Sequence, residues 1–332
     1  LDARIAALYA ITLSGGDKVV ETVAPLAEDA SMQRYVLRAL GDLPSSPMTA
    51  KLLAAGVESS DARTRLEAIV AAARQNDQGL ASDVATQLGS DDPVIAHTAF
   101  RALAQMKAAD AAFAVLDDES ASAPQLVGAT NALMRIHEAK VVDGVISRLE
   151  KEKRPDVRQL LIGALSRLHF AEGEWTGDSW GTRPDTRGPY YQPEPWSGTP
   201  KVAVALQTLL ETADPEEAAF LVKEMARNRI QSDSALSRIL TLAKENPKVI
   251  PEAVAQLATT DTISADGVDI LLASLQSKET TPATKSNAVI ALAKSDSAEG
   301  AMRSLVALHQ LEKNIAAMQE GVKAANAIED EH

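Results

Sequence analysis

The side chains best suited to chemistry lie in one thirty-residue segment, AEGEWTGDSWGTRPDTRGPYYQPEPWSGTP, at positions 171–200. This insertion contains the chain's three tryptophans and two of its four tyrosines: Trp175, Trp180, Trp196, Tyr190 and Tyr191. Aromatic rings with polar tips can stack on flat partners such as pyranose rings, which suggests a glycan platform. Alternatively, the rings pack together as the segment's own small core, and we favour this simpler interpretation. If the segment is extended, one of the two adjacent tyrosines faces outward and is the better ligand candidate.

Charged side chains in the insertion fit turns and ion pairs. Arg183 precedes a proline, which favours extended backbone, and Asp185 begins a four-residue turn that ends in glycine. Arg183 and Arg187 could pair with Asp178, Asp185 or carboxylates on neighbouring helices. The two aspartates could also bind calcium. However, calcium takes six to eight oxygen ligands and the spacing of a calcium-binding helix–loop–helix is absent, so turn formation is the favoured role.

No other residue pattern predicts catalysis, a metal or a cofactor. The histidines at 97, 137, 169 and 309 are scattered singly without zinc-site spacing, and we expect each at a helix surface or helix end. A nucleophile elbow, a phosphate-binding glycine loop and a dinucleotide fingerprint are all missing. The chain has no cysteine, which excludes disulfides, thiolate zinc sites, Fe–S ligation and covalent haem attachment within it. We therefore predict a non-catalytic protein.

Charge and hydropathy narrow the possible partners. The formal net charge is −13 and the sequence pI is about 4.9. Nucleic acids and anionic membranes call for a basic surface, and no basic run stands out. No apolar run approaches the roughly 18 residues of a membrane span. We expect protein partners or neighbouring domains, a glycan as an alternative, no nucleic acid and no membrane insertion.

A 31-residue repeat organises the chain before the insertion. Apolar helical segments open at five equally spaced positions: Ser31, Ala62, Pro93, Pro124 and Pro155. Six, nine and ten residues after each start, mostly alanine or leucine recurs, and these offsets share one face of a helix. Second helical runs lie between the segments, including 18–27, 48–57, 80–88 and 141–149. Two helices per unit are typical of an α-solenoid.

Proline and capping residues indicate where helices begin. Asp92-Pro93 and Asp214-Pro215 place an N-cap aspartate before a proline at the first helical position. Thr199-Pro200 restarts the helices after the insertion. The later helices are expected near 201–212, 215–229, 234–244, 247–258, 265–277, 282–294 and 298–325.

These observations predict an all-α fold: an α-solenoid interrupted by one long, non-helical insertion rich in Trp, Tyr, Pro and Gly. The expected parts are repeats at 1–170, the insertion at 171–200, further repeats at 201–325 and a polar tail at 326–332. Fixing thirty residues has a large entropic cost that five aromatic rings only partly offset. We therefore expect the insertion to pack on the repeats, across their groove.

The Asp-Pro helix starts and the Ala/Leu faces resemble HEAT-like repeats in their short bacterial form of about thirty residues. The tetratricopeptide alternative requires a Trp-Leu-Gly-Tyr pattern that is absent. The resemblance implies stacked helix pairs that present an extended binding groove.

The run Trp180-Gly-Thr-Arg-Pro-Asp-Thr-Arg-Gly-Pro-Tyr-Tyr191, followed by Trp196, resembles a segment of large exported bacterial proteins. Those proteins join a β-propeller dehydrogenase-like domain, a HEAT-like array and a c-type cytochrome domain. The resemblance implies a scaffold in an exported, periplasmic or cell-surface redox or carbohydrate-processing protein. Because the chain starts at Leu1 inside a predicted helix, we expect a processed product or a fragment. Neither haem chemistry nor dehydrogenase activity carries over, since the chain lacks a Cys-x-x-Cys-His motif.

Overall fold

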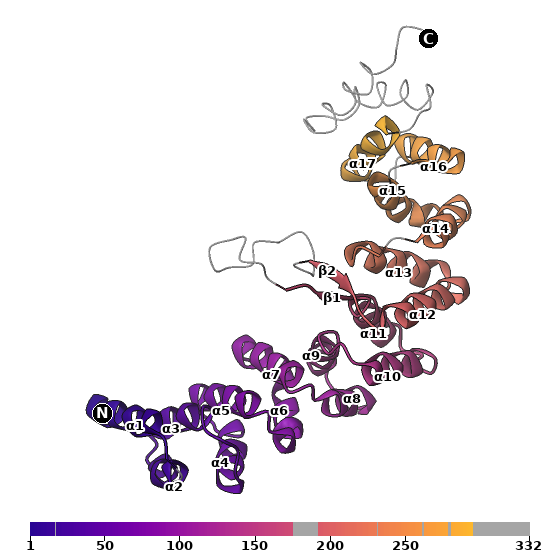
Figure 1. Cartoon of the computed structure of the whole chain (residues 1–332). Helices are drawn as coiled ribbons and strands as arrows, with labels where there is room; N and C mark the ends of the chain where they lie inside the picture. Colours follow the sequence, from indigo (N-terminus) through magenta and orange to yellow (C-terminus); the bar gives the residue numbers. More distant parts are fainter. Residues whose placement is uncertain (17, 175–191, 231, 261, 278–279, 295–332) are drawn as a thin grey trace. The chain divides into compact units, whose positions relative to one another are not determined.

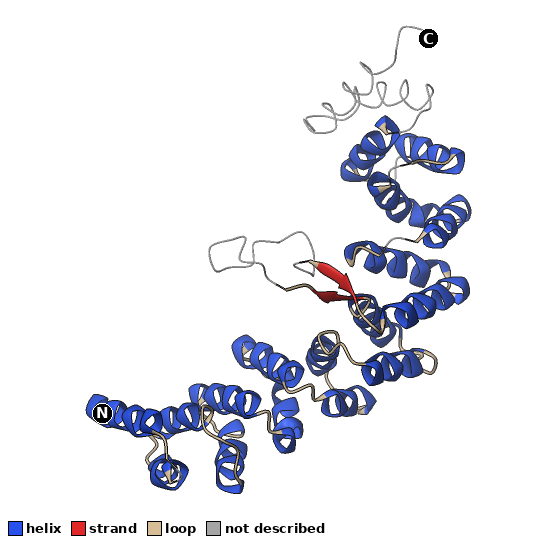
Figure 2. Ribbon diagram, in the orientation of Figure 1, coloured by secondary structure: helices blue, strands red, loops and turns tan. Residues whose placement is uncertain are grey.

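A computed structural model of the chain describes residues 1–16, 18–174, 192–230, 232–260, 262–277 and 280–294. Within these residues the protein is all-α, with one pair of three-residue strands as the exception (Figure 2). The chain divides into two compact units. Unit 1 comprises Leu1–Ala171 and Trp196–Gly198, and unit 2 comprises Glu172–Pro195 and Thr199–His332.

Unit 1 is built from two rows of helices that follow the helix α1 (Asp2–Ser14). The first-helix row consists of α3 (Gln33–Leu40), α5 (Ala62–Gln75), α7 (Pro93–Gln105), α9 (Ala123–Leu133) and α11 (Pro155–Arg167). The second-helix row consists of α2 (Val19–Val23), α4 (Pro47–Val57), α6 (Ala81–Thr86), α8 (Ala109–Asp117) and α10 (Ala139–Leu149). Each first-row helix packs on the next first-row helix, and α4, α6 and α8 do the same in the second row (Figure 1). This nearest-neighbour packing is that of an α-solenoid, as predicted.

The 31-residue columns form the core of unit 1. Both the sixth-position and the ninth-position columns are buried throughout: Leu37, Ala68, Ala99, Thr130 and Leu161, then Leu40, Ala71, Ala102, Leu133 and Ala164. The polar member, Thr130, donates its hydroxyl to the Leu126 carbonyl 2.7 Å away, so it is buried without losing a hydrogen bond. In the tenth-position column Met134 is only half-buried, because α9 ends one residue before it.

Capping residues set the helix starts where the sequence predicts them. The Asp92 carboxylate accepts the Val94 N–H at 2.9 Å, and the Asp214 carboxylate accepts the N–H groups of Glu216 and Glu217. The expected start at Ser31 is two residues early, since α3 begins at Gln33. Asp29 accepts both the N–H and the hydroxyl of Ser31, at 2.9 and 2.7 Å, which holds Ser31 in a turn before the helix.

Glutamine side chains tie α5 to α3 and α7 to α5. The Gln75 amide donates to the Leu40 carbonyl at 2.7 Å, and Gln105 donates to the Ala73 carbonyl at 3.2 Å. Both acceptors lie in the last turn of the preceding first-row helix, where each carbonyl also accepts the backbone N–H three residues on, from Leu43 and Asn76. These bonds fix the spacing between successive first-row helices.

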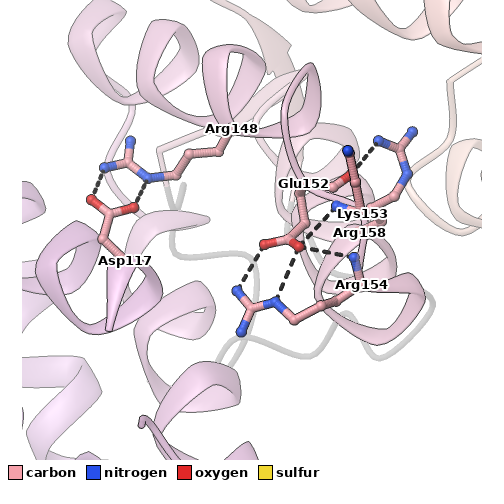
Figure 3. A network of polar contacts seen from close by, with 6 residues as sticks. All are labelled: Asp117, Arg148, Glu152, Lys153, Arg154 and Arg158. Carbon is pink, nitrogen blue, oxygen red and sulfur yellow. Dashed lines mark hydrogen bonds and ion pairs between the residues drawn. The ribbon is translucent and has the colours of Figure 1, made fainter. Parts of the chain in front are cut away.

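A second set of ties involves α8, α10 and the loop before α11 (Figure 3). Arg148 holds the Asp117 carboxylate with two donors and lies over the Phe113 ring, 4.0 Å from its centroid. In the loop, Glu152 accepts from the Arg154 guanidinium at 2.8 and 3.0 Å, and this bond is the main reason that the Glu152 pKa falls to about 2. The bidentate geometry makes the α8–α10 contact more specific than a single ion pair.

Unit 2 repeats the helix-pair pattern. It contains α12 (Thr199–Thr212), α13 (Pro215–Arg227), α14 (Asp233–Glu245), α15 (Ile250–Thr259), α16 (Ala265–Gln276) and α17 (Pro282–Ala293). Helices α12, α14 and α16 contact in one series and α13, α15 and α17 in another. The first six helices expected after the insertion are therefore confirmed. The seventh, at 298–325, and the tail at 326–332 lie outside the described residues.

Candidate functional site

The insertion enters and leaves the helices through a short two-stranded ribbon. Strand β1 (Phe170–Glu172) pairs with β2 (Pro193–Pro195), and the Gly173 N–H donates to the Gln192 carbonyl at 2.6 Å. A side chain at Gly173 would place its Cβ 2.9 Å from that carbonyl oxygen, so the close approach requires glycine. The ribbon brings the two ends of the insertion together.

Of the candidate interaction residues, Trp196 lies within the described part of the chain. The other seven lie outside it: Trp175, Trp180, Arg183, Asp185, Arg187, Tyr190 and Tyr191. Asp178, the second candidate calcium ligand, also lies outside. The aromatic platform and the calcium alternative therefore stay predictions.

Trp196 anchors the outgoing end of the insertion to unit 1. Its indole N–H donates to the Leu168 carbonyl at 2.8 Å, just beyond the end of α11. Its ring meets the His137 ring edge-on, with centroids 5.3 Å apart. Gly198 lies close against the indole, where any Cβ would collide with the ring. The half-buried Trp196 thus uses both its ring and its polar tip inside unit 1.

Two histidines lie near Trp196. We call the group formed by the following residues the base cluster: His137, Leu168, His169, Phe170 and Trp196. The His137 Nε2 lies 2.8 Å from the Phe170 carbonyl, so Nε2 carries the proton and donates it. His169 is buried and packs edge-on against the Phe170 ring, with centroids 4.4 Å apart. Burial lowers the His169 pKa to about 4, which keeps this imidazole neutral near pH 7. His169 follows α11 as a helix-end residue, but it is not at the surface.

The contacts of the base cluster hold the outgoing end of the insertion to unit 1. The His137 and Trp196 ring N–H groups donate to backbone carbonyls, the Arg167 guanidinium donates to the Phe170 carbonyl at 3.3 Å, and the rings of His137 and Trp196 meet edge-on. Glu172 and Glu174, the carboxylates next to it in sequence, are exposed. In the described part of the chain, no group of three or more His, Cys, Asp and Glu side chains could hold a metal ion. None of the described helices combines the length and apolar character needed to span a bilayer.

A second candidate site, not predicted from the sequence, is a hollow of about 300 Å³ on the first-helix row. We call it the arginine hollow. Its lining comes from α3, α5 and α7: Arg38, Leu66, Glu67, Val70, Ala71, Arg74, Val94 and Thr98. Arg38 lies 3.7 Å from Glu67, and Arg74 lies 2.7 Å from Asp42. Apolar side chains and exposed cations thus share one concave surface.

The sequence did not predict this site, because the net charge of the chain is negative. A chain with 46 acidic and 33 basic residues reads as acidic throughout. The signal becomes visible when the sequence is divided by its 31-residue period, because the first helix then contains arginine in four of the five repeats, α9 being the exception.

Comparisons with known proteins show no family for this chain. No protein-family model matches the chain, and no curated protein matches it. Among known structures, one similar chain belongs to a homology model of the full-length AP-3 complex in an intermediate open conformation. The two chains share 12% identity at a TM-score of 0.44, over 96% of this chain and 58% of that one. An engineered protein shares 18% identity at a TM-score of 0.31, over 66% of this chain and 97% of its own. This chain therefore spans little more than half the length of the first relative.

Proposed function

We propose that the protein is a non-catalytic scaffold that binds another protein segment along the first-helix row of unit 1. The arginine hollow is the observation that carries this proposal, because it combines a concave shape with apolar and charged lining. Val94 at its edge is 57% exposed, so it offers apolar surface to a ligand beside the charged side chains. Solenoid repeats provide extended surfaces of this kind for protein partners.

Site-specific crosslinking tests this function. A photoreactive phenylalanine analogue at Val94, in the hollow, is compared with the same group at Met48, which is 47% exposed at the start of α4 in the second-helix row. After irradiation in the native source, the Val94 position should give a discrete protein adduct that the Met48 position does not give. Adducts that are absent at Val94, or identical at both positions, would contradict the proposal.

The wider setting is part of the same proposal. The resemblance of the insertion supports a scaffold that positions domains of an exported redox or carbohydrate-processing protein. The intact mass and reduced absorption spectrum of the native species distinguish the possibilities. A much larger polypeptide with a c-type haem band fits the multidomain setting, and a haem-free species near the 35.1 kDa of this chain removes it.

The alternative function is glycan binding by the aromatic insertion, which rests on its five tryptophans and tyrosines. Tryptophan fluorescence should then change with an oligosaccharide, and Tyr191→Ala should abolish the change. No response across a broad glycan panel would reject this alternative.

A further inference from the structure

We propose that the partner segment is an acidic peptide with interspersed apolar side chains, bound by its carboxylates to arginines around the arginine hollow. This inference rests on the proposed scaffold function and adds the chemistry of the partner. Three features of unit 1 support it: the excess of positive charge on the first-row helices, the exposure of particular arginines, and the apolar side chains that line the hollow with them.

The first-helix row is basic, although the chain as a whole carries a formal charge of −13. Its helices contain Arg34, Arg38, Arg63, Arg65, Arg74, Arg101, Arg158 and Arg167. The same helices contain two acidic residues, Glu67 and Asp156. The aspartates Asp61 and Asp92 cap two of these helices, but within the helices themselves arginine is in excess. An excess of positive charge on one row gives a local potential that attracts an acidic partner and repels a basic one.

Some of these arginines form hydrogen bonds inside unit 1, and others are exposed to solvent. The Arg65 and Arg158 guanidinium groups donate to backbone carbonyls of nearby loops. The Arg38 and Arg74 side chains are 57% and 44% exposed at the hollow. Arg101 is exposed one helical turn beyond Thr98 on the same stripe of α7, and within the described residues it forms no ion pair. Arg101 can therefore bind a ligand without breaking an ion pair. Arg38 and Arg74 are paired with Glu67 and Asp42 but keep exposed donors that a ligand carboxylate could reach.

The lining of the hollow includes apolar side chains. Leu66 and Val70 lie on α5, and Val94 lies across from them on α7. A leucine-sized side chain inserted there would remove apolar area from water on both sides, at about 25 cal/mol per Å². Arginine forks bind carboxylates in a bidentate manner, which would fix the flanking acidic residues.

The same surface favours a peptide over a nucleic acid. Glu67 and Asp42 lie among the arginines, within 3.7 and 2.7 Å of Arg38 and Arg74. A continuous phosphate chain would meet these carboxylates at close range, whereas a peptide can place neutral or apolar residues opposite them. A peptide with spaced carboxylates and intervening apolar side chains matches a surface on which arginines and apolar side chains lie side by side.

The test uses the full chain and a fluorescein-labelled peptide of about fourteen residues, composed of Glu and Asp with a leucine at every fourth position. Fluorescence anisotropy at low salt gives its Kd. The triple variant Arg38→Gln, Arg74→Gln, Arg101→Gln should weaken binding about tenfold, because three partly screened charge contacts are lost. The control Lys51→Gln, Lys140→Gln, Lys151→Gln removes the same charge from the second-helix row and the loop after it, and should change the Kd less than about twofold.

Further measurements distinguish the contribution of charge from that of apolar contact and test whether a variant is still folded. A peptide with Gln and Asn in place of Glu and Asp should bind about tenfold more weakly, and added salt should weaken the acidic peptide. Val94→Ser should weaken both peptides by a similar factor. Arg101→Gln alone breaks no ion pair within the described residues and should weaken binding measurably without lowering the thermal midpoint.

Three results would overturn the acidic-peptide inference: equal losses in the two triple variants, no peptide binding at about 1 mM, or tighter binding of a single-stranded oligonucleotide of equal charge. A discrete adduct at Val94 together with any of these would leave the scaffold function standing and reject only this partner chemistry. Absence of the adduct would instead reject the scaffold function itself.

Discussion

At the scale of single residues, the buried imidazole of His169 makes the folding stability of unit 1 depend on pH. Burial lowers its pKa to about 4, whereas the unfolded chain presents an ordinary value near 6.5. Between these values the unfolded state binds more protons than the folded state, so stability is complete above pH 6.5 and is lost as the pH falls toward 4. Asp29 and Glu152, with pKa values of about 2, titrate below this window.

We predict that the free energy of unfolding falls by about 1–2 kcal/mol between pH 7 and pH 4.5 through this residue, with partial solvent screening allowed for. His169→Gln should flatten this part of the profile, as measured by urea unfolding at each pH. The control His97→Gln changes an exposed histidine and should keep the wild-type slope. Parallel profiles for wild type and His169→Gln would contradict the assignment.

Residue-level prediction from the sequence was uneven. Trp196 could be identified as notable, because aromatic residues are rare in this chain. Its partners could not, since Leu168 and His137 are 28 and 59 positions away and meet it only after α9 and α11 are packed. Arg38, Arg74 and Arg101 were missed for a different reason, because their grouping depends on which helix of each pair carries them.

At the scale of elements, contact between successive first-row helices depends on small residues. A Cβ on Gly41, just after α3, would lie 2.9 Å from the Cα of Ala71 and 3.0 Å from its Cβ on α5. Since the obstacle includes backbone of a buried helix, it cannot move aside as a long side chain would.

Gly41→Ala should therefore destabilise unit 1 by about 1–3 kcal/mol through overpacking. Chemical denaturation followed by circular dichroism measures the change. Gly79→Ala provides the matched control, because its new Cβ would meet only the Asp77 carboxylate, at 3.2 Å. If the two variants were equally stable, the α3–α5 contact would be looser than described.

Elements were far more predictable than sites. The helix starts at Ala62, Pro93 and Pro155 agree with the structure, because N-caps, prolines and a 31-residue apolar period all act locally. The ribbon of β1 and β2 was not predicted. Its strands are three residues each, and they pair across a long insertion, so no local periodicity could reveal them.

At the scale of the whole molecule, the chain returns to unit 1 after leaving it. Residues 196–198 belong to unit 1 although 172–195 do not. The returning segment includes Trp196, which contacts Leu168 and His137 in the last repeat of unit 1 and the loop before it. A solenoid is most exposed at its terminal repeat, where one face lacks a neighbour.

We predict that a fragment of residues 1–198 unfolds at a higher denaturant midpoint than a fragment of residues 1–171, because only the longer one contains the Trp196 anchor. The lost indole hydrogen bond and ring burial correspond to roughly 2–4 kcal/mol. Trp196→Ala in the longer fragment should remove most of the difference. Identical midpoints for the two fragments would show that the anchor does not stabilise unit 1.

The unequal charge of the two helix rows has a physical consequence for unit 1 as an object in solution. The first-row helices contain eight arginines and two carboxylates, whereas the second-row helices contain five carboxylates and three cations. Positive and negative charge are therefore displaced from one another across the width of the repeat stack, which gives it a permanent transverse dipole moment. Such a body orients in an electric field, and its orientation adds to electric birefringence most strongly when little salt screens the charges.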